Sequence, residues 1–157
     1  MRTVEPERFR AVMGHFATGV AVVTVDAPDG PMGMTANAVA SLSLDPVLVL
    51  VCFDNGARTL PEVRRAGRFG VNVLAAGQEQ LARRFASKED SKFAEVSHSV
   101  HDGIPVLDGA LAWVGCTLER FVPGGDHTIG IGAVHAAELG APGIEPLVWF
   151  RGDYGSL

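Results

Sequence analysis

The chain has 157 residues, of which 47% are hydrophobic, and it carries a formal net charge of -5 at pH 7. This length fits one domain with a real hydrophobic core, so we expect a single domain over residues 1–157. The acidic balance argues against a nucleic-acid binder, which would show a basic patch or a high isoelectric point.

Several features of the sequence indicate where the protein works. Residues Met1 to Arg8 contain no apolar segment of the kind that a signal peptide needs. The longest strongly apolar run, Val47 to Phe53, is far shorter than the ~20 residues of a membrane-spanning helix. We therefore expect no contact with membranes. Two cysteines are too few for a disulfide scaffold, which favours a reducing compartment, so we expect a cytoplasmic protein. Cys116 lies in an apolar, strand-like segment and is expected to be a small buried hydrophobe.

An amphipathic helix is predicted near the start of the chain, from about Glu5 to Phe16. Apolar side chains recur there at i, i+3, i+4 and i+7, the spacing of one helix face, and Gly19 breaks the pattern. A β-branched run from Val20 to Val25 predicts a buried strand. The turn that follows, with Asp-Gly between two prolines, allows Met32 to Ala36 to return as the second strand of a hairpin.

A polar stretch of small residues from Gly33 to Ser43 runs into an Asp-Pro turn and then into the apolar strand Val47 to Phe53. Its hydroxyl and amide side chains suit a surface that a planar, phosphate-bearing ligand approaches closely. The alternative is a strand end and a polar loop whose hydroxyls bind their own backbone. The apolar composition of Val47 to Phe53 predicts a central strand of the sheet.

An Asp-Asn-Gly turn closes that strand, and Arg58 and Thr59 follow at the start of a predicted helix. We expect Thr59 to cap this helix, with Pro61 in its first turn and Gly67 at its end. An anion binds readily at a helix N-terminus beside an arginine, because unpaired amides and the helix dipole favour negative charge. The alternative is a plain cap with a surface arginine.

The rest of the chain is again mainly strands. A strand from Phe69 to Leu74 and a helix from Gln78 to Ala86 lead to a polar stretch, Ser87 to Gly103, which predicts a long mobile surface loop. Turn residues then separate the last three predicted strands, Ala110 to Phe121, His127 to Leu139 and Leu147 to Phe150. Many strands joined by tight turns favour a barrel or a sandwich over alternating βαβ units.

Few other residues indicate chemistry. His127 follows a Gly-Gly-Asp turn, from which its ring either points into a cleft or lies on the surface. His98 and His101 have no cysteine or glutamate at metal-site spacing, so we expect no metal. No G-x-S-x-G motif supports a hydrolase. Gly130-Ile-Gly132 lacks the third glycine and the strand-to-helix turn of a dinucleotide motif, so we set that interpretation aside.

Short motifs follow one another along nearly the whole chain. They are Phe16-Ala-Thr-Gly-Val-Ala-Val-Val-Thr24, Gly33-Met-Thr-Ala-Asn37, Ser41-Leu-Ser-Leu-Asp-Pro46, Cys52-Phe-Asp54, Ala57-Arg-Thr59, Phe69-Gly-Val-Asn-Val-Leu74, Leu81-Ala-Arg-Arg-Phe-Ala86, Lys92-Phe93, Gly125-Asp-His127 and Arg151-Gly-Asp-Tyr154. In order and spacing the chain resembles the flavin reductase-like domain family of FMN-binding split barrels. This family includes the reductase components of two-component flavin-dependent monooxygenases.

The resemblance implies a mainly β fold with short helices, a Greek-key-like split β-barrel, and a flavin held at a homodimer interface. It implies that the flavin ring lies along residues 34–37 and beside the backbone of residues 52–54. The phosphate and ribityl chain would lie at residues 41, 58 and 59, and an adenine at residues 88 and 93. The implied cofactor-binding residues are Met34, Thr35, Ala36, Asn37, Ser41, Cys52, Phe53, Asp54, Arg58, Thr59, Lys88, Phe93 and Tyr154. His127 would lie on the nicotinamide side, where Tyr154 closes the pocket.

The implied reaction is hydride transfer from NADH or NADPH to FMN or FAD, after which the reduced flavin passes to a separate monooxygenase. The cofactors carry this chemistry and the protein supplies position and electrostatics, so His127 needs only to position the nicotinamide. The lack of an arginine cluster for a 2′-phosphate favours NADH. One alternative is a flavin- or heme-binding barrel that acts as a carrier or sensor without oxidising NAD(P)H. A split-barrel oxidase of the pyridoxamine or deazaflavin type would show more basic phosphate ligands.

Overall fold

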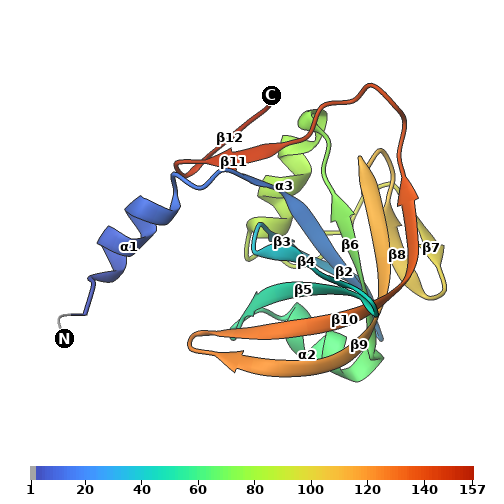
Figure 1. Ribbon diagram of the computed structural model, residues 1–157. Helices are drawn as coiled ribbons and strands as arrows, with labels where there is room; N and C mark the ends of the chain where they lie inside the picture. Colours follow the sequence, from blue (N-terminus) through green and yellow to red (C-terminus); the bar gives the residue numbers. More distant parts are fainter. Residues whose placement is uncertain (1–2) are drawn as a thin grey trace.

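Seven strands form one antiparallel sheet that curls into a barrel in the computed structural model, which describes residues 3–157 (Figure 1). Their order across the sheet is β3-β2-β6-β9-β10-β5-β4, so strands far apart in the sequence lie side by side. These strands are β2 (Ala21–Ala27), β3 (Gly30–Ala36), β4 (Val39–Leu44), β5 (Val47–Asp54), β6 (Arg68–Val73), β9 (Ala112–Gly124) and β10 (His127–Leu139).

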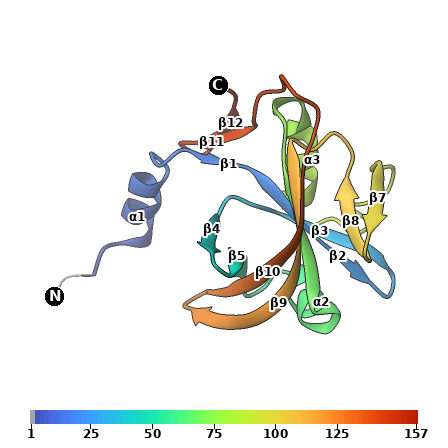
Figure 2. The same ribbon diagram turned by 45° about the vertical axis from the view of Figure 1, so that its right-hand side comes forward.

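Smaller elements surround this barrel. One small sheet contains β1 (Thr18–Gly19), β11 (Val148–Phe150) and β12 (Asp153–Gly155), and the other pairs β7 (His98–His101) with β8 (Ile104–Leu107). The helices α2 (Thr59–Ala66) and α3 (Glu79–Ala86) lie at opposite ends of the barrel, and a 3-10 turn at Ala76–Gln78 precedes α3 (Figure 2). Among residues 3–157, no helix has the length and apolar character needed to cross a bilayer.

The barrel closes where β3 leads into β4. These strands form the two edges of the seven-stranded sheet, and only Asn37 and Ala38 connect them. The backbone N–H of Cys52 donates a hydrogen bond to the carbonyl of Ala38, at 3.0 Å. This seam, defined as residues 36–38 and Cys52, therefore brings the end of β3 beside β5.

Aromatic rings fill the interior of the barrel. Phe53 is fully buried, and its ring meets the edges or faces of Phe69 and Phe121 with centroids 6.2 and 6.1 Å apart. A Cβ atom at Gly130 would lie 2.7 Å from the Phe53 ring, and one at Gly132 would lie 2.7 Å from the Phe69 ring. These two glycines of β10 therefore leave room for the aromatic rings. The Gly130-Ile-Gly132 motif thus serves the packing of the core.

Asn72 of β6 is a buried polar residue that joins three strands. Its Nδ2 donates to the Val22 carbonyl and to Thr24 Oγ1, each at 3.1 Å, and its Oδ1 accepts from the backbone N–H of Leu107 at 2.9 Å. Because a buried amide is costly unless it is hydrogen-bonded, these three bonds fix β2 and β8 against β6.

Most predicted elements are present, and three predictions about them are wrong. The polar stretch after Ala36 does not stay a loop, because Val39–Leu44 pairs with β5 as the edge strand β4. Ser87 to Gly103 is not one long loop, because His98–His101 pairs with β8. The strand at Val47 is not central: it is second from the edge, with only alternate residues buried. The strands β4 and β7 are short, and edge or hairpin pairing lets their polar residues face outward.

The helix α1 (Pro6–Met13) stands away from the barrel in both views (Figures 1 and 2). None of its residues is buried: Phe9 and Val12 of the helix are 60 and 56% exposed, and Phe16, just after it, is 70% exposed. The backbone N–H of Arg151 donates to the carbonyl of Gly14 at 2.7 Å and attaches the base of the helix. An eight-residue helix is marginal in water without tertiary packing, so its apolar face needs a further surface.

We expect Asn72→Ala to lower the free energy of unfolding by about 2 to 4 kcal/mol, because buried groups of β2 and β8 lose the partner that joins them to β6. Urea denaturation followed by circular dichroism measures this change. Gln80→Ala is the matched control, since it deletes the same amide from the exposed face of α3. Equal losses for the two variants would contradict the account of Asn72.

Candidate functional site

The end of β5 and the start of β10 lie side by side. Asp54 and His127 are opposite each other in the register of the two antiparallel strands. The carboxylate of Asp54 accepts a hydrogen bond from the backbone N–H of Gly56 at 2.7 Å, which shapes the turn that leads to α2. Two segments that the sequence singled out separately, residues 52–54 and His127, are therefore adjacent.

Asn55 fastens this turn to the tip of the β9–β10 hairpin. Its backbone N–H donates to the Asp126 carbonyl at 3.0 Å, and its Nδ2 donates to the Gly125 carbonyl at 3.1 Å. Its Oδ1 accepts from the hydroxyl of Thr128 at 2.7 Å. Sequence reasoning treated Asn55 only as a turn residue, although a side-chain amide that both donates and accepts was a signal that it could bridge two turns.

His127 is held by its neighbour in the same turn. Its Nδ1 lies 2.7 Å from a carboxylate oxygen of Asp126, and because a carboxylate only accepts, Nδ1 carries the proton and donates. The pKa of Asp126 is lowered by this hydrogen bond and by the charge of His127. In the neutral ring, Nε2 is therefore the nitrogen without a proton, and it remains available as an acceptor.

Arg58 and Thr59 begin the helix α2, but in a different way from the prediction. Arg58, not Thr59, occupies the cap position, and no side chain caps the helix. Thr59 is the first helical residue and is 3% exposed, and its Oγ1 has no hydrogen-bond partner among the described residues. Gly67 ends the helix in the left-handed conformation, as predicted. The unpaired hydroxyl of Thr59 is a buried polar group that a ligand or a water molecule would satisfy.

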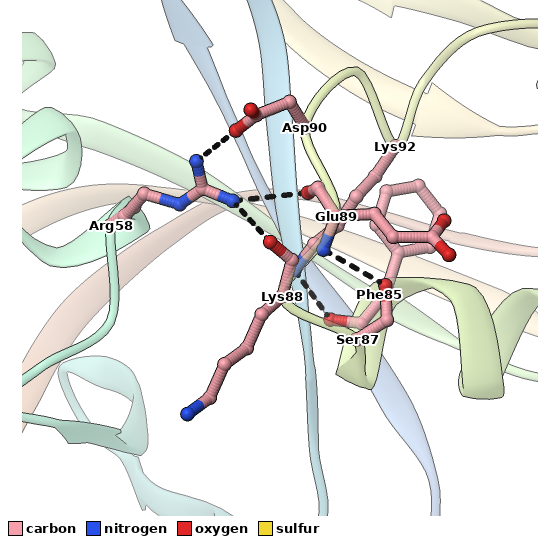
Figure 3. A network of polar contacts seen from close by, with 7 residues as sticks. All are labelled: Arg58, Phe85, Ser87, Lys88, Glu89, Asp90 and Lys92. Carbon is pink, nitrogen blue, oxygen red and sulfur yellow. Dashed lines mark hydrogen bonds and ion pairs between the residues drawn. The ribbon is translucent and has the colours of Figure 1, made fainter.

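The guanidinium of Arg58 is bound by the loop that follows α3 (Figure 3). Its Nη2 donates to the carbonyls of Lys88 and Glu89, each at 3.0 Å, and its Nη1 donates to the carboxylate of Asp90. We call this arrangement of Arg58 with residues 88–90 the arginine clasp. The hydrogen bond from Arg58 and its positive charge lower the pKa of Asp90.

The β3 residues predicted to line a flavin ring differ in how open they are. Met34 and Thr35 are half-buried, Ala36 is buried, and Asn37 is exposed at the seam. The hydroxyl of Thr35 donates to the carbonyl of Ala82 in α3 at 2.6 Å, so it binds the protein's own backbone. The hydroxyl of Thr35 thus joins β3 to α3 and does not bind the local backbone, and its oxygen can still accept a hydrogen bond.

Ser41 and Phe93 lie in different surroundings. Ser41 is exposed on the edge strand β4, opposite Val49 of β5. The ring of Phe93 packs against the rings of Phe85 and His98, with centroids 5.0 Å apart in both cases. Phe93 therefore has a packing role on α3, beside any ligand contact that it makes.

Tyr154 lies apart from His127 within one chain. It belongs to the small sheet near α3, where its ring packs on Trp149 at 4.8 Å and under the guanidinium of Arg83 at 4.9 Å. His127 lies at the tip of the β9–β10 hairpin, well away from β12 in both views (Figures 1 and 2). Burial raises the pKa of Tyr154. A single chain therefore does not bring these two predicted residues together.

Arg83 of α3 lines one of two open grooves, and its guanidinium contacts Tyr154, which lines the other. One, of about 310 Å³, includes Asp153 and Tyr154, and the other, of about 410 Å³, includes Arg84 and Glu89. Neither groove contains residues of β3 or β5. Tyr154, one of the predicted flavin-binding residues, lines the first groove, whereas Asn37, Asp54 and Arg58 are exposed outside both grooves.

The two cysteines have different surroundings. Cys116 is fully buried in the barrel, and burial raises the pKa of its thiol to about 12, so the prediction of a neutral buried hydrophobe is confirmed. Cys52 is half-buried, and it lies between Val51 and Phe53, whose side chains fill the core. Since side chains alternate along a strand, the Cys52 side chain faces out of the barrel.

Comparison with known proteins identifies the family. The flavin reductase like domain matches residues 13–157, and the chain belongs to this family. It is 40% identical over 153 residues to the reductase subunit HsaB of a flavin-dependent monooxygenase from Mycobacterium tuberculosis, covering 96% of this chain and 82% of that protein. It is 38% identical over 157 residues to an NADH-dependent flavin reductase from a Rhodococcus species, covering 98% of this chain and 88% of that protein.

A solved structure agrees with these relatives. The NADH:FAD oxidoreductase SgcE6 of Streptomyces globisporus C-1027, in complex with NAD and FAD fragments, matches with a TM-score of 0.91 and 38% identity, covering 100% of this chain and 97% of that one. The predicted family, the mainly β split-barrel fold and the expected class of enzyme, a flavin reductase, are confirmed. The roles of the individual site residues stay predictions.

Proposed function

We propose that the chain is an NADH-dependent flavin reductase whose flavin lies over the seam, with its phosphate at Arg58. One observation carries this proposal. The turn after β5 is joined through Asn55 to Asp126 and Thr128, the two neighbours of His127, and it leads into Arg58 on the other side. A nicotinamide-positioning group and a phosphate-binding group thus flank the same strand end, as a reductase needs.

The residues at this surface fit a flavin chemically. Small and half-buried side chains at Met34 and Thr35 allow a flat ring to approach β3 closely. Arg58 offers a planar charged group suited to a phosphate, at the N-terminus of α2 where the helix dipole favours an anion. The Oγ1 of Thr59 has no partner among the described residues but almost no accessible surface, so it donates to a ligand oxygen only when its surroundings open.

The protein contributes position and electrostatics to the reaction. When bound, the flavin accepts a hydride from the nicotinamide. Backbone groups of β3 and of residues 52–54 hold the ring plane, and Asn55 fixes the turn that carries His127. Because Asp126 orients the ring of His127, its Nε2 presents a defined edge to the second ligand. Close stacking makes the transfer effectively unimolecular, so no side chain in this surface has to act as an acid or base.

The open surface agrees with a reductase that gives up its product. Asn37, Asp54, Arg58 and Lys88 are all exposed, so the ligand is not enclosed by the chain that binds it. The relative HsaB is the reductase subunit of a flavin-dependent monooxygenase. We infer that this chain likewise supplies reduced flavin to a separate monooxygenase component. The thiols Cys52 and Cys116 are both unpaired, which agrees with the predicted reducing, cytoplasmic setting.

The site is completed by a second copy of the chain in a homodimer. Apolar side chains of α1 are uncovered, and so are Leu44 and Val47 of the β4–β5 hairpin, at 87 and 48% exposure. Monomeric proteins rarely expose large apolar patches, and a short helix such as α1 needs a surface to pack on. A dimer covers both patches and encloses the open flavin surface. It also allows Tyr154 of one copy to approach the His127 side of the other.

We expect His127→Ala to lower the kcat for NADH oxidation with FMN by at least about tenfold, because a misplaced nicotinamide loses the advantage of close stacking. The dissociation constant for FMN, measured by flavin fluorescence, should change by less than about twofold. Stopped-flow absorbance under anaerobic conditions measures the reduction rate directly.

His135→Ala is the matched control, because His135 is an exposed histidine of the same strand. It should leave both quantities unchanged. A loss of FMN affinity with an unchanged reduction rate would show that His127 has been given the wrong role. No NADH oxidation by the wild-type protein with either FMN or FAD would overturn the proposed reaction itself.

We expect sedimentation equilibrium to give twice the mass of one chain at micromolar concentration. The double variant Phe9→Ser, Phe16→Ser should shift this equilibrium to the monomer, because it removes two exposed apolar rings from α1 and the segment just after it. Val100→Ser, which changes an exposed apolar residue of β7 far from α1, should remain dimeric. A monomeric wild-type protein would contradict the dimer.

A further inference from the structure

The proposed function assigns the guanidinium of Arg58 to the flavin phosphate, but in the arginine clasp this guanidinium is already hydrogen-bonded. A guanidinium offers an oxyanion two forks of paired N–H groups, and each fork includes Nη2. Both hydrogens of Nη2 are committed to loop carbonyls, those of Lys88 and Glu89. Nη1 donates to Asp90 as well. A phosphate therefore cannot bind Arg58 through a complete fork unless part of the clasp opens.

Asp90 is the charged member of the clasp. Its side chain is 84% exposed, and among residues 3–157 its ion-pair partner is Arg58. Glu89, by contrast, uses only its backbone carbonyl toward Arg58. The carboxylate of Asp90 thus lies where the phosphate of FMN would bind. The two negative groups repel each other and compete for the guanidinium of Arg58.

Lys92 adds a second positive charge near Arg58. Its Nζ donates to the carbonyl of Phe85 at 3.2 Å, which closes the C-terminal end of α3 (Figure 3). Burial lowers the pKa of Lys92, and the positive charge of Arg58 lowers it further, so the two cations lie near each other. Two cations attract a phosphate, and Asp90 is the anion already bound at this cluster.

Resting on the proposed function, we propose that Asp90 is an internal competitor for the flavin phosphate, which weakens the binding of phosphorylated flavins and favours their release. Opening the clasp exchanges the carboxylate of Asp90 for the phosphate on Arg58, and no covalent bond changes. Riboflavin, which has no phosphate, does not compete with Asp90. Asp90 is therefore a residue that sets the discrimination between riboflavin and FMN.

The test compares dissociation constants of riboflavin and FMN, measured by quenching of flavin fluorescence at low ionic strength. Asp90→Asn should tighten FMN binding by about twofold to tenfold and leave riboflavin binding unchanged, because it removes the competing charge from an exposed pair. Glu89→Gln is the matched control: it removes the same charge from the adjacent residue, whose side chain does not bind Arg58. It should change FMN binding much less.

Arg58→Gln separates this inference from the phosphate assignment on which it rests. It should weaken FMN but not riboflavin, and Asp90→Asn should have no further effect in its presence. If Arg58→Gln weakens FMN selectively and Asp90→Asn does not strengthen it beyond Glu89→Gln, the competitor role is wrong and the phosphate site stands. If Arg58→Gln does not discriminate between FMN and riboflavin, the phosphate assignment and the competitor role are both wrong. Equal effects of Asp90→Asn on the two flavins would also overturn the competitor role.

Discussion

Closure of the barrel at the seam is the constraint on which the rest of the structure depends. The two edges of the seven-stranded sheet are joined by Asn37 and Ala38, and the hydrogen bond from Cys52 N–H to the Ala38 carbonyl fixes β5 against the end of β3. Without this closure, β3 would lie at one edge of the sheet, far from β5 and from the turn that carries Arg58 near the other edge. The aromatic core around Phe53 holds the closed form from inside.

The sequence predicted those parts of the fold that depend on local pattern. Apolar periodicity and turn residues are properties of a single segment, so the β2–β3 hairpin and the end of α2 at Gly67 were predictable. The strands β4 and β7 were not, because polar residues such as Ser41 and Ser99 become strands only through the partner beside them. For the same reason, composition alone could not tell that β5 lies next to the edge of the sheet.

The candidate site was predictable as a set of residues and not as a set of contacts. Arg58 was named because an arginine at a helix N-terminus suits an anion, and the family resemblance assigned His127 to the nicotinamide side. Asn55 and Asp90 act through partners about 70 and 32 residues away in the chain, and single-sequence reasoning has no access to such pairings. The proposed homodimer would account for the separation of Tyr154 from His127, because a second chain would then supply the residue that one chain keeps apart.

Hydrogen exchange followed by mass spectrometry tests the location of the flavin site most directly. If the flavin lies over the seam with its phosphate at Arg58, saturating FMN should slow amide exchange in residues 34–38 and 52–59 and leave the β7–β8 hairpin, residues 98–107, unchanged. Riboflavin should slow exchange in the first segment and less in the second segment near Arg58. Unchanged exchange at residues 34–38, with protection elsewhere, would contradict the placement of the flavin at the seam.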